Sequence, residues 1–146
     1  MSDLPGLWEC PLCRRTFANR NQSHTCRPLG ELDAHFRGKD EVVREIFDRI
    51  VEVVRSLGPV EVLAEKTRIA LHTRMSFAAF MPRVHWLDGH VVLAERLDSE
   101  RFTKIEVYSP RNVLHAFRLR DPAEVDAEVI DWFTRAYAVG RQQHLR

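Results

Sequence analysis

Apolar residues recur at helical spacing in the stretch that follows Gly38–Asp40. They fall three or four positions apart, on one side of a helix: Val43, Ile46, Phe47, Ile50, Val54 and Leu57. This pattern predicts an amphipathic helix. Its end is predicted at Gly58-Pro59, because a glycine after the last turn followed by a proline is a typical helix stop.

A second helical pattern lies near the C-terminus. Asp121-Pro122-Ala123-Glu124 combines an N-cap residue, proline at the first helical position and glutamate three residues after the cap. The apolar positions that follow again keep helical spacing: Val125, Val129, Trp132, Phe133, Ala136 and Tyr137. We therefore expect a helix that begins at this cap and ends at Gly140.

Between the two helices the pattern changes to alternation with period two and to short apolar runs, which indicate strands. Six strands are predicted: Val60–Ala64, Thr67–Thr73, Ser76–Val84, Val91–Leu97, Phe102–Tyr108 and Val113–Leu119. Asp88-Gly89 predicts a hairpin turn, and residues 109–112 predict another. Short links between consecutive strands favour an antiparallel β-meander of about five or six strands. With an N-terminal and a C-terminal helix packed on one face, the predicted fold class is α+β.

The N-terminal segment holds all three cysteines of the chain. Cys10 and Cys13 form a Cys-x2-Cys pair, and His24 and Cys26 follow. A Cys-x2-Cys turn directs two sulfurs into one hollow, and residues two apart share one face of an extended strand. The spacing therefore predicts one tetrahedral Zn²⁺ bound by these four side chains. A coordinatively closed Cys3His set is typical of a structural ion.

Other interpretations of this segment have less support. A disulfide leaves one of the three cysteines unpaired, and nothing resembles a secretory signal. A redox Cys-x2-Cys normally lies in a βαβ context, which the pattern lacks. His35 is an alternative fourth ligand in place of His24. Because His24 and Cys26 are too close for ligands on adjacent helical turns, we expect a zinc ribbon or knuckle over residues 1–30, followed by an α+β domain over residues 31–146.

Composition narrows the class of protein further. The 45% hydrophobic content is ordinary for a globular chain. No apolar run approaches the length of a membrane span, and no targeting segment is recognised. We therefore expect a cytoplasmic protein without a membrane partner, in a compartment where thiols stay reduced.

The net charge of +1 conceals an uneven distribution. Residues 31–65 carry −4, whereas residues 66–120 carry +5 and residues 1–30 carry +2. Such asymmetry is typical of an anion-binding face, although arginines that point outward from strands give the same sum. Basic side chains beside an aromatic ring hold phosphate and stack a base. The predicted ligand-binding residues are Lys66, Arg68, Arg74, Arg83, His85, Trp86, Arg96, Arg101, Lys104, His115 and Arg118.

Signals for catalysis are faint. The side chains that titrate near neutral pH in the strand region are His72, His85, His90 and His115. His115 alternates with apolar residues of its strand, a position more typical of a hydrogen-bonded core residue than of a general base. No serine elbow, phosphate-cradling glycine loop or paired-carboxylate motif occurs. The sequence therefore gives little support to an enzymatic function.

Several short segments carry a resemblance to a known family. They are Trp8-Glu9-Cys10-Pro11-Leu12-Cys13, Leu32-Asp33-Ala34-His35-Phe36, Gly38-Lys39, Gly58-Pro59-Val60, Phe77-Ala78, Pro82-Arg83 and Ala136-Tyr137-Ala138-Val139-Gly140-Arg141. Through them the chain resembles an uncharacterised bacterial family that has a Trp-x-Cys-Pro-x-Cys segment before a domain of unknown function. Similar domains without the zinc segment resemble C-terminal modules of predicted transport proteins. The resemblance implies a cytoplasmic bacterial origin and transfers no catalytic residue.

The sequence thus favours a zinc-binding protein whose basic sheet binds nucleic acid or another phosphorylated ligand. A protein–protein interaction adaptor with a purely structural zinc site is the alternative from another class. The two differ in salt dependence, because phosphate contacts weaken steeply with ionic strength and an apolar protein interface does not.

Overall fold

A computed structural model describes residues 8–9, 11, 16–17 and 31–143 of the chain. In the N-terminal part, the two-residue strands β1 (Trp8–Glu9) and β2 (Thr16–Phe17) pair in antiparallel register. In the larger part, helices α1 (Glu41–Leu57) and α2 (Ala127–Gly140) flank a six-stranded antiparallel sheet. The predicted α+β fold class is confirmed.

The first helix forms where the apolar spacing predicts it, after a short 3-10 turn, η1 (Leu32–Phe36). Its buried residues are Val43, Ile46, Phe47, Ile50, Val51, Val53 and Val54. Gly58 ends it in the left-handed region, with φ of 153°. The Tyr137 hydroxyl lies where a Cβ on Gly58 would project, and it donates a hydrogen bond to the Pro59 carbonyl at 2.9 Å. This glycine therefore both stops α1 and lets α2 approach its end.

The second helix begins later than predicted. Asp121 and Glu124 form the expected capping box, but they cap a separate 3-10 turn, η2 (Pro122–Glu124). The α-helix has its own N-cap, Asp126, whose carboxylate accepts a hydrogen bond from the Val129 backbone N–H at 3.2 Å. Two acidic caps in succession thus divide the predicted helix into a turn and a shorter helix.

Six strands form the sheet, in the number that the alternation predicts. They are β3 (Glu61–Ala64), β4 (Ile69–His72), β5 (Ser76–Pro82), β6 (Leu87–Leu93), β7 (Phe102–Ser109) and β8 (Asn112–Leu119). Their order is β3-β4-β5-β6-β8-β7, so the predicted meander holds as far as β6, after which the last two strands exchange places. Most residues of β8 are buried, whereas β7 contains no buried residue. The more apolar strand therefore takes the inner position, and the more polar strand lies at the edge.

The prediction of a turn at Asp88-Gly89 is wrong. Both residues lie inside β6, and the β5–β6 hairpin turns at residues 83–86 instead. Packing explains the glycine: a Cβ on Gly89 would lie 3.0 Å from the Ala79 carbonyl oxygen and 3.0 Å from ring atoms of both Phe80 and Phe117. The missing side chain therefore lets two aromatic rings close over the strand.

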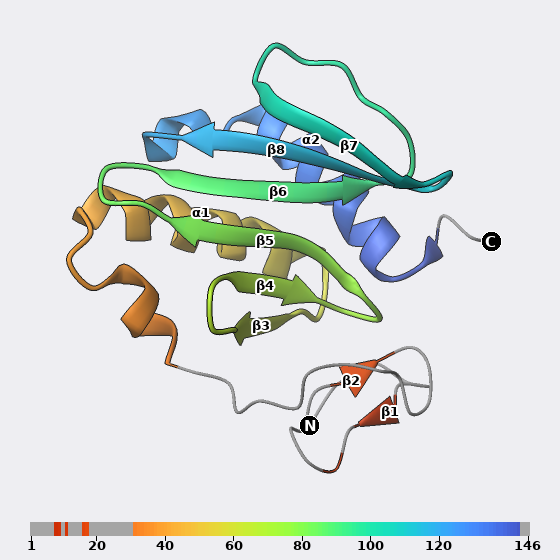
Figure 1. Cartoon of the computed structure of the whole chain (residues 1–146), viewed down its shortest axis with the longest axis horizontal. Helices are drawn as coiled ribbons and strands as arrows, with labels where there is room; N and C mark the ends of the chain where they lie inside the picture. The colour runs from red at the N-terminus through yellow and green to blue at the C-terminus, as the bar shows by residue number, and fades with distance from the viewer. Residues whose placement is uncertain (1–7, 10, 12–15, 18–30, 144–146) are drawn as a thin grey trace.

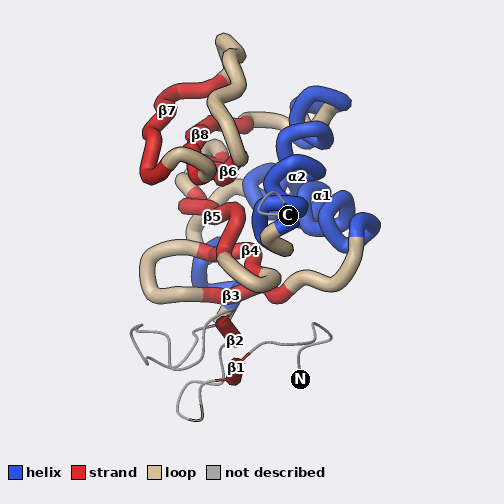
Figure 2. The backbone as a smooth tube through the Cα atoms, turned by 90° about the vertical axis from the view of Figure 1, so that its right-hand side faces the viewer, coloured by secondary structure: helices blue, strands red, loops and turns tan. Residues whose placement is uncertain are grey.

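Both helices lie on the same side of the sheet, behind the strands in Figure 1 and beside them in Figure 2. Aromatic rings fill the space between the helices and the sheet. The ring centres of Phe47 and Phe80 lie 5.4 Å apart, and those of Phe117 and Trp132 lie 5.7 Å apart. The opposite side of the sheet faces the viewer in Figure 1 and carries no helix among the described residues. We call this side the open face.

Candidate ligand-binding face of the sheet

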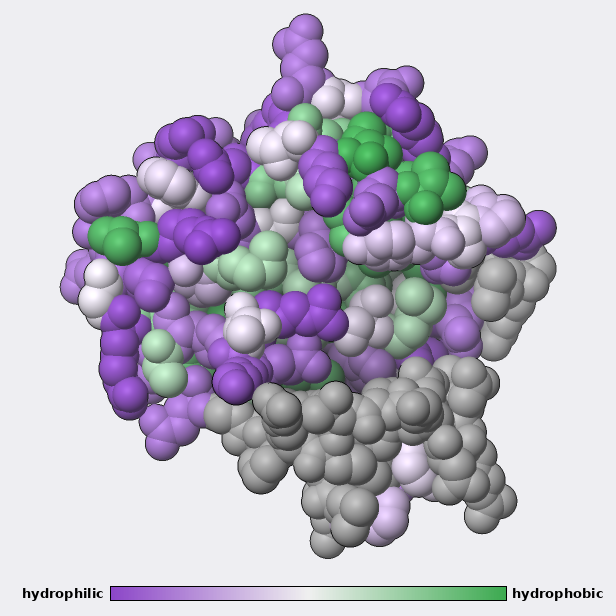
Figure 3. All heavy atoms as spheres, in the orientation of Figure 1, coloured by the Kyte–Doolittle hydropathy of each residue, from purple (hydrophilic) through white to green (hydrophobic). Residues whose placement is uncertain are grey.

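One row of the open face contains a residue from every strand. Strand pairing places these six residues side by side: Leu63, Ala70, Ala79, His90, Ala116 and Lys104. We call them the central row. Because three of the six are alanines, the middle of the face carries short side chains, and Figure 3 shows pale green, weakly hydrophobic atoms there among hydrophilic ones. Leu63, Ala70 and Ala79 are buried, so the accessible part of the central row consists of His90, Ala116 and Lys104.

Five side chains gather where the β5–β6 turn meets the end of β8. We call them the Trp86 cluster: Arg83, Trp86, Asp88, Arg118 and Arg120. The guanidinium carbon of Arg118 lies 4.4 Å from the centre of the Trp86 ring, and that of Arg120 lies 5.6 Å from it. Asp88 accepts hydrogen bonds from Nε of Arg118 at 2.8 Å and from Nε of Arg83 at 3.1 Å. One carboxylate and one indole ring therefore hold the arginines in place.

The cluster keeps an excess of positive charge. Burial raises the pKa of the Asp88 carboxyl, but the hydrogen bonds from Arg118 and Arg83 outweigh burial and hold this pKa below its usual range. The Trp86 indole N–H adds to the lowering, although it lies outside regular hydrogen-bond geometry. Arg120 makes no ion pair with any residue that the structure describes. Three arginines thus face one carboxylate, which leaves a net charge of +2.

Arg68 lies close enough to His90 of the central row for its charge to act on the imidazole. Nε of Arg68 donates a hydrogen bond to Oε1 of Glu65 at 2.8 Å. Burial, together with the charge of Arg68, lowers the pKa of His90 to about 4. The imidazole of His90 is therefore neutral at pH 7, beside a cation and within the floor of the open face.

Two predicted ligand residues, Arg96 and Lys104, lie together but away from the Trp86 cluster. They line a shallow polar depression of about 630 Å³ beside β7. Nε of Arg96 contacts Oδ1 of Asp98 at 3.0 Å, and Nζ of Lys104 lies 3.8 Å from Glu106. Nearby acids therefore offset both charges.

Three further predicted residues lie in turns. Lys66 is exposed between β3 and β4, and Arg74 lies between β4 and β5, where its Nε donates a hydrogen bond to Gln142 at 3.1 Å. His85 lies in the β5–β6 turn, and its Nδ1 is 2.6 Å from Oδ2 of Asp40. These turns do not bring the three side chains into one site.

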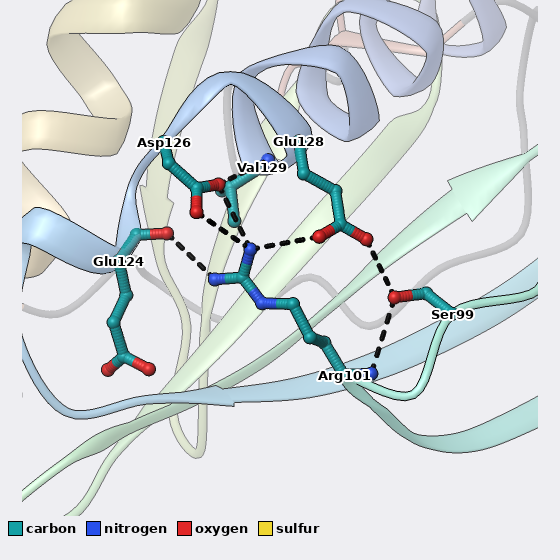
Figure 4. A network of polar contacts seen from close by, with 6 residues as sticks. All are labelled: Ser99, Arg101, Glu124, Asp126, Glu128 and Val129. Atoms are coloured by element: carbon teal, nitrogen blue, oxygen red, sulfur yellow. Dashed lines mark hydrogen bonds and ion pairs between the residues drawn. The ribbon is translucent and has the colours of Figure 1, made fainter.

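Arg101 points toward the start of α2 rather than onto the open face (Figure 4). Its Nη1 donates hydrogen bonds to Asp126 at 3.0 Å and to Glu128 at 3.1 Å, and its Nη2 donates one to the Glu124 carbonyl at 2.9 Å. The hydrogen bond from Arg101 lowers the pKa of Asp126. Because two carboxylates neutralise this arginine, its contacts tie the β6–β7 connection to α2.

His115 is buried beneath the same connection. Its Nδ1 donates a hydrogen bond to the Val113 carbonyl at 2.9 Å, and its Nε2 accepts one from the Leu97 backbone N–H at 2.9 Å. Both ring nitrogens are thus occupied, and burial lowers the pKa of the imidazole. This geometry matches the interpretation of His115 as a hydrogen-bonded core residue.

Sequence reasoning missed three residues of the candidate site: Asp88, His90 and Arg120. The sequence pattern places Asp88 in a turn, whereas strand pairing puts it opposite Arg118 in the sheet. The available signal was the spacing of two between Trp86, Asp88 and His90, and again between Arg118 and Arg120, because residues two apart share a sheet face.

Two absences hold within the described ranges. No helix there is long and apolar enough to cross a membrane. No group of three or more His, Cys, Asp or Glu side chains is placed there to hold a metal ion. The predicted zinc ligands Cys10, Cys13, His24 and Cys26 lie outside the described residues.

Comparison with known proteins assigns the larger domain to a family. A family model described as a domain of unknown function, DUF5655, matches residues 32–140. No curated protein and no solved structure matches the chain. The matched region contains both helices, all six strands of the larger sheet and the Trp86 cluster. The chain therefore belongs to the DUF5655 family.

Proposed function

We propose that the open face binds single-stranded nucleic acid, or a smaller ligand that carries the same phosphate groups, at the Trp86 cluster. The observation that carries this proposal is the Arg118 guanidinium, which is stacked on Trp86 and held by Asp88. Arg120 lies beside it without an ion-pair partner among the described residues. This combination offers a planar stacking surface and hydrogen-bond donors for phosphate within one cluster.

Physical arguments favour a single strand over a duplex. Arg118 is already oriented by its two partners, so a ligand loses less side-chain entropy when it binds there. His90, Ala116 and Lys104 are the accessible positions of the central row, and an extended chain can continue across them from the Trp86 cluster. Bases of a single strand expose their faces for stacking, whereas those of a duplex are already stacked.

Replacing Arg83 and Arg120 together by alanine is expected to weaken binding of a labelled oligothymidylate by about tenfold at about 0.1 M salt, because two phosphate contacts are lost. Arg118 is kept, since its contacts with Asp88 and Trp86 support the local structure. Fluorescence anisotropy over a salt series measures the effect. The slope of log affinity against log salt should fall in magnitude by up to about 1.4, or about 0.7 for each contact.

The matched control replaces Arg49 and Arg135 by alanine. Both side chains are exposed on the helices, where they pair with Glu52 at 3.6 Å and Asp131 at 2.8 Å. This variant loses the same charge, and its affinity should stay close to that of the unchanged protein. Equal losses in the two variants would assign the effect to net charge and remove the Trp86 cluster as the site. Absence of binding at low salt would refute the proposal.

The proposal includes one structural Zn²⁺, held by Cys10, Cys13, His24 and Cys26. Purified protein is expected to contain one zinc ion per chain, and Cys13→Ser to lose it, because the substitution removes a thiolate ligand. Chelation is expected to leave the larger domain folded, since its core lies between the helices and the sheet. Elemental analysis and circular dichroism measure both outcomes. Cooperative melting of the whole chain on chelation would contradict the division at residue 30.

One observation keeps the adaptor function as a second candidate. Val107 and Tyr108, on the edge strand β7, are 64% and 62% exposed. An edge strand with exposed apolar side chains can pair with a strand of a protein partner. Binding through this edge would change little with salt, whereas binding through the Trp86 cluster would weaken steeply.

A further inference from the structure

His90 differs from the other members of the central row because it is titratable and partly buried. Its neighbours across the sheet are Ala79 on β5 and Ala116 on β8, neither of which has a polar side-chain atom. Burial and the charge of Arg68 lower the pKa of this imidazole. None of the described residues forms a hydrogen bond with it. A neutral imidazole carries one donor and one acceptor, so both are unused here.

The groups around His90 affect the protonation state of its imidazole when no ligand is bound. The charged and titratable side chains of this face, taken element by element, are Glu61 on β3, Arg68 with its partner Glu65 before β4, His72 on β4, Asp88 on β6, Arg118 on β8, and Lys104, Glu106 and Tyr108 on β7. On β5 the neighbouring positions are Ala79 and Met81, which carry no charge. Burial first, and the charge of Arg68 second, disfavour the imidazolium, so the pKa of His90 falls to about 4.

We propose that His90 takes up a proton when a phosphate group binds on the open face, so that imidazolium and Arg68 hold the phosphate together. This inference rests on the proposed function and names the chemistry of its ligand, a phosphate oxyanion. The proton comes from solvent and adds to the free ring nitrogen, which then donates a hydrogen bond to a phosphate oxygen. The phosphate charge compensates Arg68 and attracts the imidazolium, which offsets the burial that is the main cause of the neutral ring in the free protein.

Proton uptake makes binding depend on pH in a defined direction. The bound state holds more protons than the free protein, so the affinity rises as the pH falls. Uptake of one proton changes affinity by at most tenfold per pH unit, and we expect about tenfold tighter binding at about pH 5.5 than at about pH 7.5.

The test is calorimetric titration of the 146-residue chain with a decathymidylate that carries no terminal phosphate. Its phosphodiesters and thymines do not titrate near neutral pH, so any proton taken up enters the protein. Titrations at about pH 6 in two buffers of different ionisation enthalpy count these protons, and we expect about one per bound phosphate at the His90 site. A nuclear magnetic resonance titration of the His90 ring, free and bound, measures the same change without any substitution.

His90→Gln keeps a hydrogen-bonding side chain that does not titrate. This variant should lose both the proton uptake and the pH dependence of binding. His85→Gln is the matched control, because His85 is exposed and contacts Asp40 in the neighbouring turn. The control should retain the proton uptake.

The outcomes separate this inference from the proposed function. Binding without proton uptake overturns the inference and leaves the proposed function standing. Uptake that persists in His90→Gln overturns the assignment to His90. Absence of binding in the unchanged protein overturns the proposed function, and this inference with it.

Discussion

Acidification from about pH 7 to about pH 4.5 is expected to lower the free energy of unfolding by about 2 kcal/mol through His90 alone. The pKa of His90 is about 4 in the folded protein, against about 6.5 in an unfolded chain. The unfolded chain therefore binds the proton first as the pH falls. Stability is fully present above about pH 6.5 and is lost between there and about pH 4. His115 adds to the loss in the same direction, because burial lowers its pKa as well.

The pH range over which stability is lost distinguishes the effect of these histidines from that of the paired carboxylates. The pKa of Asp88 and that of Asp126 lie below the usual aspartate range. Both carboxylates therefore stay charged until the pH falls below about 4, and their ion pairs persist through the interval in which His90 acts. A loss of stability between about pH 6.5 and about pH 5 belongs to buried histidines.

Urea unfolding of the ligand-free protein at a series of pH values measures this effect. His90→Gln should flatten most of the decline, since the substituted side chain does not titrate. His85→Gln is the control for the substitution itself, because His85 is largely exposed and contacts Asp40; equal flattening in the two variants would contradict the assignment to His90. A protein whose stability stays constant from about pH 7 to about pH 5 would contradict the assignment of a buried neutral His90.

Arg101→Met is expected to lower the free energy of unfolding by about 2 kcal/mol, because several charge-assisted hydrogen bonds are lost together. In the folded protein this guanidinium contacts Asp126, Glu128 and the Glu124 carbonyl, and its carbon lies 5.3 Å from the centre of the Trp132 ring. Methionine keeps the aliphatic stem and removes the donors. The two carboxylates then face each other without a cation (Figure 4).

The position of Arg101 in the fold explains why its substitution should affect more than one ion pair. The connection from β6 to β7 has to pass β8 to reach the sheet edge, and Arg101 ends this connection. Its hydrogen bonds attach the connection to the first turn of α2. Removing them separates two segments that lie far apart in the sequence, so the substitution should also raise the hydrogen-exchange rates of the connection.

Arg96→Met is the matched control for Arg101→Met. Arg96 lies in the same connection, but it pairs only with Asp98, and the two side chains are 64% and 85% exposed. An exposed pair of this kind contributes about 0.5 kcal/mol or less. Chemical denaturation of the two variants measures the difference. Equal losses would show that Arg101 acts as an ordinary surface charge.

Local sequence signals predicted most elements of the fold. The helical spacing from Val43 to Leu57 placed α1 closely, because a continuous apolar stripe needs a core to cover it. Errors arose where a local signal competes with packing. Asp88-Gly89 has the composition of a hairpin turn, but the glycine serves the contact with Phe80 and Phe117 inside β6. The exchange of β7 and β8 likewise depends on which strand buries more apolar surface.

The candidate site was predicted less completely than the fold. Arg83, Trp86 and Arg118 were expected among the ligand residues, and they lie together in the Trp86 cluster. Arg101 and His115 were expected there too, yet they bond to α2 and to the β6–β7 connection. The sequence around a basic residue of a strand does not show whether its side chain will contact a ligand or a carboxylate of the protein itself. The distinction therefore depends on partners that are distant in the chain.

The sequence by itself determined the α+β class, the two helices, the number of strands and the basic character of residues 66–120, because periodicity and composition are local properties. Only the tertiary structure decided which of these basic residues converge. Strand register put Asp88 beside Arg118 and set His90 between two alanines, which made a cationic cluster next to a neutral imidazole. Register depends on contacts between residues far apart in the chain, and a shift of one residue would turn each of these side chains to the helix-covered face.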